Sequence, residues 1–360
     1  MKLVSKIMII FVSVCWINLA FWQEAQTTRT NLKGLFKSQA YQMEMPYEDD
    51  AVSSARILNT SGILQNVEVH GLVQLYFVNS EETTDQFKLR RGEVSFKGTL
   101  TDNTSFFVMI DPAKNTQGKK DSSILQDLGL TLKVLNNKVM VGQFKRPISL
   151  EGLQSSTTLE LLERATIVRV LGDKRDMGVM VQGEATAFKL QYMVGVFNGE
   201  GPNVAEANQK KDVAAMVIWK PTDKTQIYAS AYEGSQSVKN DVQDRVGTGG
   251  RVEWGPVAVK VEYLQAQDAK VEQDGWYVLA SYPLAHLGIE VLNPVKVAAR
   301  YEEWDANKDD AKEQHTWTLG AQYSLDPKDI SKVGVDFFYL DGKGQEQDDY
   351  GVSLGYQGKF

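Results

Sequence analysis

The feature that most limits the fold of this chain is a long series of short segments in which apolar and polar residues alternate. Sixteen such segments follow one another between residue 66 and residue 360, each of a length that suits one strand. The candidate strands lie near 66–78, 87–100, 104–111, 124–135, 138–147, 176–184, 187–198, 212–221, 225–233, 244–255, 256–266, 274–283, 293–304, 314–325, 331–341 and 349–360. Alternation with a period of two predicts an all-β chain whose strands each separate an apolar medium from water.

The connections between these segments alternate between short and long. Asn136–Asn137 and Gly255–Pro256 are short, whereas Pro112–Ser123, Asn198–Lys211 and Pro147–Arg175 are long. Short turns at one end and long loops at the other are typical of an antiparallel transmembrane β-barrel with an even number of strands. Sixteen closed strands would enclose an aqueous channel, which eight would not.

Aromatic residues near strand ends on the apolar face favour the membrane barrel over a soluble jelly roll or propeller, which also alternate. The aromatic residues in such places are Phe77, Trp219, Trp254, Trp276, Tyr282, Tyr301, Tyr323, Tyr339, Tyr356 and Phe360. Rings of this kind form girdles at both membrane interfaces of a barrel.

The N-terminus predicts export. Lys2 and Lys6 precede an apolar run from Ile7 to Ala20, which is too short for the roughly 20 residues of a spanning helix. We therefore expect three parts, a signal peptide (1–25), a short periplasmic segment that is partly helical (26–65) and a transmembrane β-barrel (66–360).

Composition excludes several kinds of chemistry. The single cysteine, Cys15, lies within the expected signal peptide, so the mature chain would have no disulfide and no thiolate. Three scattered histidines, His70, His286 and His315, predict no metal centre and no catalytic site, hence no enzyme and no cofactor. The net charge of −7 argues against a nucleic-acid partner.

The polar faces of the clear strands carry more basic than acidic residues, ten against six. The basic residues are Arg91, Lys97, Lys133, Lys189, Arg245, Arg251, Lys260, Lys296, Arg300 and Lys359. The acidic residues are Glu68, Glu93, Glu253, Glu262, Glu302 and Asp336. If these faces line the lumen, the excess of about four positive charges favours anions. The alternative is that the charges pair and give no selectivity.

Several segments together resemble the phosphate-selective porin O and P family. They are Phe87–Gly98 with its arginine pair, Phe106–Asp111, Val141–Gly152, Leu162–Arg164 and Arg175–Val179. The resemblance covers a little under a third of the chain, and beyond it the agreement is architectural. It implies a sixteen-stranded trimeric porin in the outer membrane of a Gram-negative bacterium, with members that prefer phosphate or pyrophosphate.

The resemblance also implies functional residues. Arg90 and Arg91 match the arginine pair of the family, and the loop Pro147–Arg175 matches the third loop, which folds into the lumen and sets the constriction. Cations at or near this loop are Lys145, Arg146, Arg164 and Arg175. The remaining arginine track and the lysine cluster of the family find no match, and the exposed loops are acidic instead.

The last strand, Tyr350 to Phe360, resembles the signal that the barrel assembly machinery reads. Taken together, the sequence predicts a passive porin for small anions in contact with outer-membrane lipid, with Arg91 as the residue most exposed to passing anions. The alternatives are a general non-selective porin and a barrel that serves structure or adhesion with little transport. Which solute passes is left open.

Overall fold

The computed structural model describes residues 56–58, 65–82, 84–116, 123–236, 241–309, 313–342 and 348–360. The expected signal peptide (1–25) and nearly all of the expected periplasmic segment (26–65) lie outside the described residues. Within the described ranges, no helix is long and apolar enough to span a membrane.

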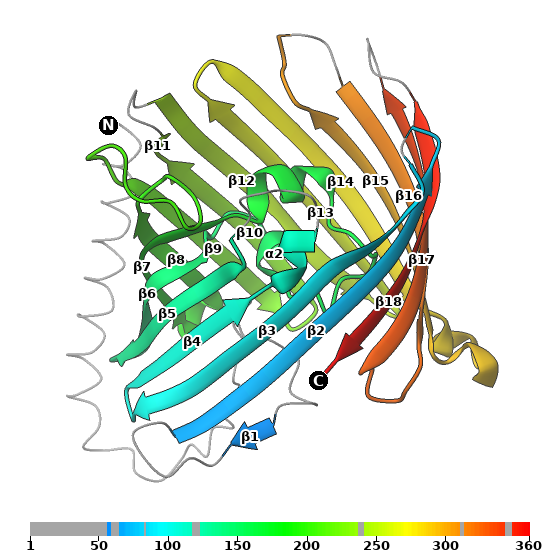
Figure 1. The fold of residues 1–360 in the computed structure, drawn as a ribbon, viewed down its shortest axis with the longest axis horizontal. Coiled ribbons are helices and arrows are strands. Elements are labelled where there is room, and N and C mark those ends of the chain that lie inside the picture. The colour runs from blue at the N-terminus through cyan, green and yellow to red at the C-terminus, as the bar shows by residue number, and fades with distance from the viewer. Residues whose placement is uncertain are drawn as a thin grey trace. The chain divides into compact units, whose positions relative to one another are not determined.

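Sixteen long strands form a closed antiparallel barrel (Figure 1). Their bounds are β2 (Gln65–Ser80), β3 (Gln86–Thr101), β4 (Thr104–Ile110), β5 (Leu125–Val134), β6 (Asn137–Lys145), β7 (Arg175–Ala185), β8 (Leu190–Phe197), β9 (Asp212–Thr222), β10 (Thr225–Glu233), β12 (Asp241–Trp254), β13 (Val257–Asp268), β14 (Val271–Pro283), β15 (Val295–Asp305), β16 (Glu313–Ser324), β17 (Ser331–Gly342) and β18 (Asp349–Lys359). Each strand pairs with the next, and β18 closes the ring against β2. The predicted all-β, sixteen-stranded barrel is confirmed.

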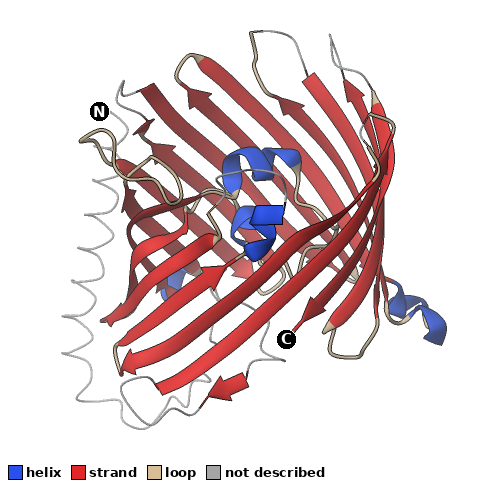
Figure 2. Cartoon of the chain, in the orientation of Figure 1, coloured by secondary structure: helices blue, strands red, loops and turns tan. Residues whose placement is uncertain are grey.

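Shorter elements complete the described chain (Figure 2). They are the strands β1 (Arg56–Leu58) and β11 (Ser235–Gln236), the helix α2 (Leu150–Leu153), the π-helical turn η2 (Val168–Gly172) and the 3₁₀ turns η1 (Pro112–Thr116), η3 (Thr186–Phe188), η4 (Leu284–Leu287) and η5 (Glu290–Leu292). β1 pairs with β2, whereas the sequence predicted no strand before residue 66.

The outer face of the wall is apolar, as the alternation predicted. Val261 and Leu319 are exposed there, and their lumenal neighbours Lys260 and Thr318 are buried. The outer face also exposes aromatic rings at strand ends, among them Trp254. A surface of this kind suits contact with lipid hydrocarbon between two interfacial girdles.

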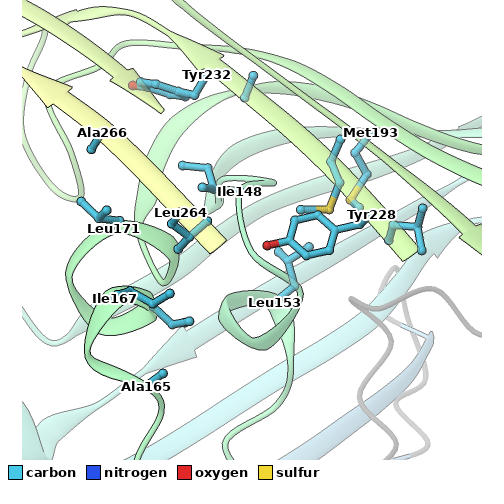
Figure 3. Packing of buried hydrophobic residues seen from close by; sticks show 14 of the residues in the cluster. Ile148, Leu153, Ala165, Ile167, Leu171, Met193, Tyr228, Tyr232, Leu264 and Ala266 are labelled. Atoms are coloured by element: carbon cyan, nitrogen blue, oxygen red, sulfur yellow. The ribbon is translucent and has the colours of Figure 1, made fainter. Parts of the chain in front are cut away.

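The lumenal face differs from the expectation on β6 to β10, where it is apolar as well. Its buried residues include Met180, Met193 and Met216. They form one hydrophobic cluster with side chains of the segment between β6 and β7, such as Ile148 and Leu153 (Figure 3). This half of the lumen therefore supports a packed segment rather than water.

One predicted lumenal cation lies outside the strands. Lys189 directly follows η3 in a left-handed conformation (φ 54°), and β8 begins only at Leu190. Its side chain is exposed and its Nζ donates to the carbonyl of Pro221 at 2.8 Å. Lys189 therefore belongs to a short turn between strands and not to the wall.

Candidate functional site

The segment 146–174, which joins β6 to β7, contacts lumenal side chains of strands far apart around the ring. We call it the constriction loop, after the role that the sequence predicts for it. Ser149 Oγ donates to Glu262 of β13 at 2.6 Å, and the amide of Leu162 donates to Asp336 of β17 at 2.8 Å. The hydroxyl of Tyr76 on β2 donates to the carbonyl of Leu162 at 2.7 Å. In Figure 1 the helix α2 of this loop lies within the ring of strands.

One buried carboxylate holds the first turn of the loop. Glu262 accepts hydrogen bonds from Ser149 Oγ, from the amide of Glu151 at 2.7 Å and from the hydroxyls of Tyr228 and Tyr277 at 2.6 and 3.0 Å. Ser149 also caps α2, because its Oγ accepts from an amide of that helix. A charge that the sequence assigned to the lumen thus fixes the loop to the wall.

Two of the predicted constriction cations serve the interior of the loop. Lys145 Nζ lies 2.9 Å from Asp173 and donates to the carbonyl of Gly152 at 2.6 Å. Arg164 lies 3.3 Å from Asp173, and its Nε donates to the carbonyl of Glu151. Burial opposes ionisation of Asp173, but Lys145 and Arg164 outweigh it and hold its pKa well below the usual range. These cations neutralise a partly buried carboxylate.

The other two predicted constriction cations are also paired. Arg146 lies over the ring of Tyr232, 4.4 Å from its centroid, and donates to that hydroxyl at 2.6 Å and to Gln243 at 3.3 Å. Arg175 forms an ion pair with Asp127 of β5 at 2.8 Å. Pairing of this kind is what burial of a charge requires.

A β-bulge shapes the arginine pair on β3. Gln74 of β2 pairs with Arg91 and the next residue, Leu75, pairs with Leu89, so Arg90 is the extra residue. Neighbouring residues of a regular strand face opposite sides, whereas a bulge turns one of them. Both arginines consequently reach the constriction loop.

Glu163 of the constriction loop receives both arginines. Arg90 donates to it from Nε and, at 2.9 Å, from Nη2, while Nη2 of Arg91 lies 3.7 Å away. Burial opposes ionisation of Glu163, but Arg91 and Arg90 outweigh it and hold its pKa at about 2. The ion pair therefore persists at neutral pH.

Arg90 and Arg91 differ in their access to water. The side chain of Arg91 is 7% exposed and donates to Gln74 at 2.5 Å, whereas those of Arg90 and Glu163 are 25% and 27% exposed. The sequence favoured Arg91 as the contact for anions, and the structure places Arg90 closer to solvent. The bulge, which local sequence does not reveal, accounts for the difference.

Two further cations complete the charge cluster and were missed by the sequence. Lys88 precedes Arg90 by two residues on β3, and Arg169 lies exposed on η2. Both interact electrostatically with Glu163. Strand phase counted from Arg91 assigns Lys88 to the outer face. The bulge reverses the phase between these two residues, so the count gives the wrong face. We call Lys88, Arg90, Arg91 and Arg169, with Glu163, the arginine-pair cluster.

Of the remaining predicted wall cations, Arg245 pairs with Asp268 at 2.7 Å and Lys359 lies 3.5 Å from Asp329. The other six fall into two groups. Lys260 pairs with Glu160 at 2.6 Å, and Arg300 donates to the carbonyl of Glu163 at 2.8 Å, so both hold the constriction loop. The second group lies toward the end of the barrel with short turns, which we call the short-turn end. Its members are Lys97, opposite Glu68 in the β2–β3 register, Arg251, paired with Glu253 at 2.8 Å, and the exposed Lys133 and Lys296.

Comparison with known proteins agrees with this architecture. The model of the family described as phosphate-selective porin O and P matches residues 66–267. No curated protein matches the chain. Among solved structures, the anion-selective porin from Comamonas acidovorans is 11% identical, with a TM-score of 0.64, over 82% of this chain and 99% of its own.

Two other solved structures are similar at low identity. The outer-membrane channel DcaP of Acinetobacter baumannii has a TM-score of 0.59 at 14% identity, over 82% of this chain and 97% of its own. OmpT of Vibrio cholerae in its trimer form has a TM-score of 0.54 at 15% identity, over 82% of this chain and 99% of its own. The match to the family model extends over more than half of the chain. The chain therefore belongs to the phosphate-selective porin O and P family and is a porin, a channel rather than an enzyme, of the outer membrane of a Gram-negative bacterium.

Proposed function

We propose that this porin passes small anions by diffusion, with a modest preference over cations. The observation that carries the proposal is the arginine-pair cluster, in which Lys88, Arg90, Arg91 and Arg169 converge on a single carboxylate, Glu163. Cationic side chains at a pore constriction favour anions, because they replace part of the hydration that the ion leaves behind.

The burial of the constriction loop indicates where the ions pass. Ile148, Leu153 and Leu171 of the loop pack within the hydrophobic cluster against the wall, whereas Arg169 and Val170 are exposed. Water therefore reaches the loop on the side that carries the arginine-pair cluster. The proposed path runs between this side of the loop and the wall around β3.

Phosphate and pyrophosphate are the candidate solutes within this class. The family description names phosphate, and the Comamonas structural neighbour is described as an anion-selective porin. Arginine offers a planar fork of donors that matches the oxygens of phosphate, and it remains charged at any relevant pH. Arg90 already holds a carboxylate with two donors in this manner.

The test is single-channel recording in a planar bilayer. We expect steady ohmic steps in potassium chloride and a partial reduction of the chloride current when phosphate is added. Absence of steps over many insertions would instead support a structural or adhesive barrel. Steps that phosphate leaves unchanged would support a general porin without phosphate preference.

We further propose a homotrimer whose barrels meet at the outer wall of the first and last strands. A groove of about 770 Å³ lies there, lined by apolar residues that include Leu75, Phe87, Val333 and Leu354. A second copy of the barrel is its proposed occupant, and one structural neighbour was solved in a trimer form. A size measurement in mild detergent that gives only monomer would contradict this.

The two ends of the chain carry two more proposals. Residues 1–25 act as the signal peptide, which mass spectrometry of the mature N-terminus tests. β18 and Phe360 act as the assembly signal, since the terminal residue exchanges two backbone hydrogen bonds with Gly71 of β2 at the seam of the ring. Deletion of Phe360 is expected to lower the amount of barrel in the outer membrane, measured by quantitative blotting of membrane fractions.

A further inference from the structure

We infer that Glu163 is a specificity-determining residue, a tethered carboxylate that occupies the oxyanion position of the Arg90–Arg91 pair and with which solute anions compete. The inference rests on the proposed passage of anions. It assigns the selectivity of the pore to an acidic residue, which no count of lumenal cations would identify.

The geometry of the ion pair is that of a bound oxyanion. Arg90 donates to both carboxylate oxygens of Glu163, one from Nε and one from Nη2. Arg91 approaches the second of these oxygens from another direction at 3.7 Å. A phosphate or carboxylate solute offers two oxygens with similar spacing, so it fits the same fork when the Glu163 side chain leaves.

The side chain of Glu163 is able to leave without release of the loop, because other groups hold the backbone at this point. The amide of Leu162 donates to Asp336, and its carbonyl accepts from Tyr76. The carbonyl of Glu163 itself accepts from Arg300 at 2.8 Å. Since the carboxylate is partly exposed, a change of rotamer displaces it once an incoming anion takes its place on Arg90.

The charge balance of the cluster keeps the site attractive to anions. Lys88, Arg90, Arg91 and Arg169 are four cations, and Glu163 neutralises one of them. Glu93 lies 3.7 Å from Arg91, and Asp336 lies near Glu163. An incoming anion therefore meets a positive field but must exchange with a carboxylate, and this weakens its binding as conduction requires.

A purely structural role for Glu163 makes a different prediction. If the ion pair served only to anchor the loop, its removal from either side would loosen the constriction in the same way. If Glu163 instead competes with solutes, removal of the carboxylate and removal of the arginine change selectivity in opposite directions. The sign of the change therefore separates the two roles.

The experiment measures reversal potentials in a potassium chloride gradient for the full-length native channel and for Glu163→Gln, Arg90→Gln and Glu253→Gln. Glu253 is a matched control, a lumenal carboxylate paired with Arg251 outside the cluster. We expect the anion-to-cation permeability ratio to rise about threefold in Glu163→Gln and to fall by a similar factor in Arg90→Gln. The control is expected to move the ratio by a smaller factor.

A variant that retains the charge gives a second measurement. Glu163→Asp is too short to span the fork of Arg90, so phosphate should reduce the chloride current at a concentration about threefold lower than for the native channel. An unchanged phosphate concentration in this variant would overturn the inference. This phosphate measurement on Glu163→Asp does not depend on whether Glu163→Gln folds.

The results that would overturn the role of Glu163 differ from the results that would refute the proposed passage of anions. A shift in the same direction for Glu163→Gln and Arg90→Gln, or a shift no larger than that of Glu253→Gln, would overturn the inference. A native channel that prefers cations would refute the proposed function. In that case a selective rise of anion permeability in Glu163→Gln would still support the competition.

Discussion

The constriction loop and the short-turn end of the lumen carry cations of the same kinds, but these cations have different environments. In and beside the loop, Lys145, Arg164 and Arg175 each lie within about 3.3 Å of a carboxylate and are largely buried. At the short-turn end, Lys133 and Lys296 are exposed to the lumen. A count of charges by strand phase treats both groups alike, although only exposed charges act on a passing ion.

The difference follows from the cost of burying a charge. A charged side chain that leaves water requires a partner of opposite sign or several hydrogen bonds. The constriction loop packs against the lumenal wall, so the cations in and against it are matched by Asp173, Glu160 and Glu163. Apart from the arginine-pair cluster, the charges in and against the loop stabilise the structure, whereas the exposed lysines at the short-turn end are available for conduction.

The largest effect is expected for Glu262→Ala, because that carboxylate anchors the loop. Four donors lose their acceptor, including the hydroxyls of Tyr228 and Tyr277, and we expect a loss of stability of about 3–5 kcal/mol. Urea unfolding followed by tryptophan fluorescence measures it, and single-channel conductance should rise as the loop loosens. Glu253→Ala, at the exposed pair with Arg251, is the control and should change stability little. Equal losses in both variants would contradict the division.

Acid should weaken the loop through Glu163. Its pKa is about 2 in the folded protein and 4.5 without interactions, so its contribution of about 3 kcal/mol is present above pH 4.5 and is lost as the pH falls toward 2. Glu151 acts in the opposite sense, since burial raises its pKa to about 6 and its stabilising effect is lost as the pH rises from 4.5 through 6. Stability should therefore be highest near pH 4.5. Thermal unfolding across pH checks this, and Glu163→Gln should reduce the acid limb to the part that Asp173 carries.

Lys260→Gln should cost stability without a large change in selectivity. The substitution leaves Glu160 buried without its partner at 2.6 Å, at a cost of about 2–3 kcal/mol. Denaturant unfolding and a reversal potential from the same preparation measure both effects. A large loss of anion preference at unchanged stability would place Lys260 among the conducting charges.

Lys296→Gln should show the opposite pattern to Lys260→Gln, with a small loss of anion preference and almost no loss of stability. It is the smallest of the expected effects. The side chain of Lys296 is exposed, so we expect unfolding to change by less than about 0.5 kcal/mol. The anion-to-cation permeability ratio should fall less than about twofold, because one exposed charge acts through screened solvent. If the ratio is unchanged while Lys260→Gln lowers it, the assignment of the two regions is reversed.

The wall of the barrel was predictable from sequence because its signals are local. All sixteen strands appear within a few residues of the expected positions, since alternation and turn residues are read directly along the chain. The apolar lumenal face of β6 to β10 was not expected. Residues such as Met193 and Met216 follow the alternation of a strand but do not reveal that a loop packs on them.

The site was predictable only in part. The motif identified Arg90 and Arg91, but their shared direction depends on a bulge opposite Gln74 and Leu75 that no local pattern announces. The sequence prediction missed the cation Lys88 for the same reason, because the bulge changes the strand phase at Lys88. The partner of the pair, Glu163, lies 73 residues beyond Arg90, and such a contact arises only from the folded barrel.

Whether the open lumen favours anions is decided by the reversal potential of the native channel in a potassium chloride gradient at neutral pH. We expect the reversal potential to shift modestly from zero toward the chloride equilibrium potential, and this shift should shrink as the salt concentration rises and screens the cluster. A shift toward the potassium equilibrium potential would contradict a preference for anions, because the arginine-pair cluster would then not control the ions that pass.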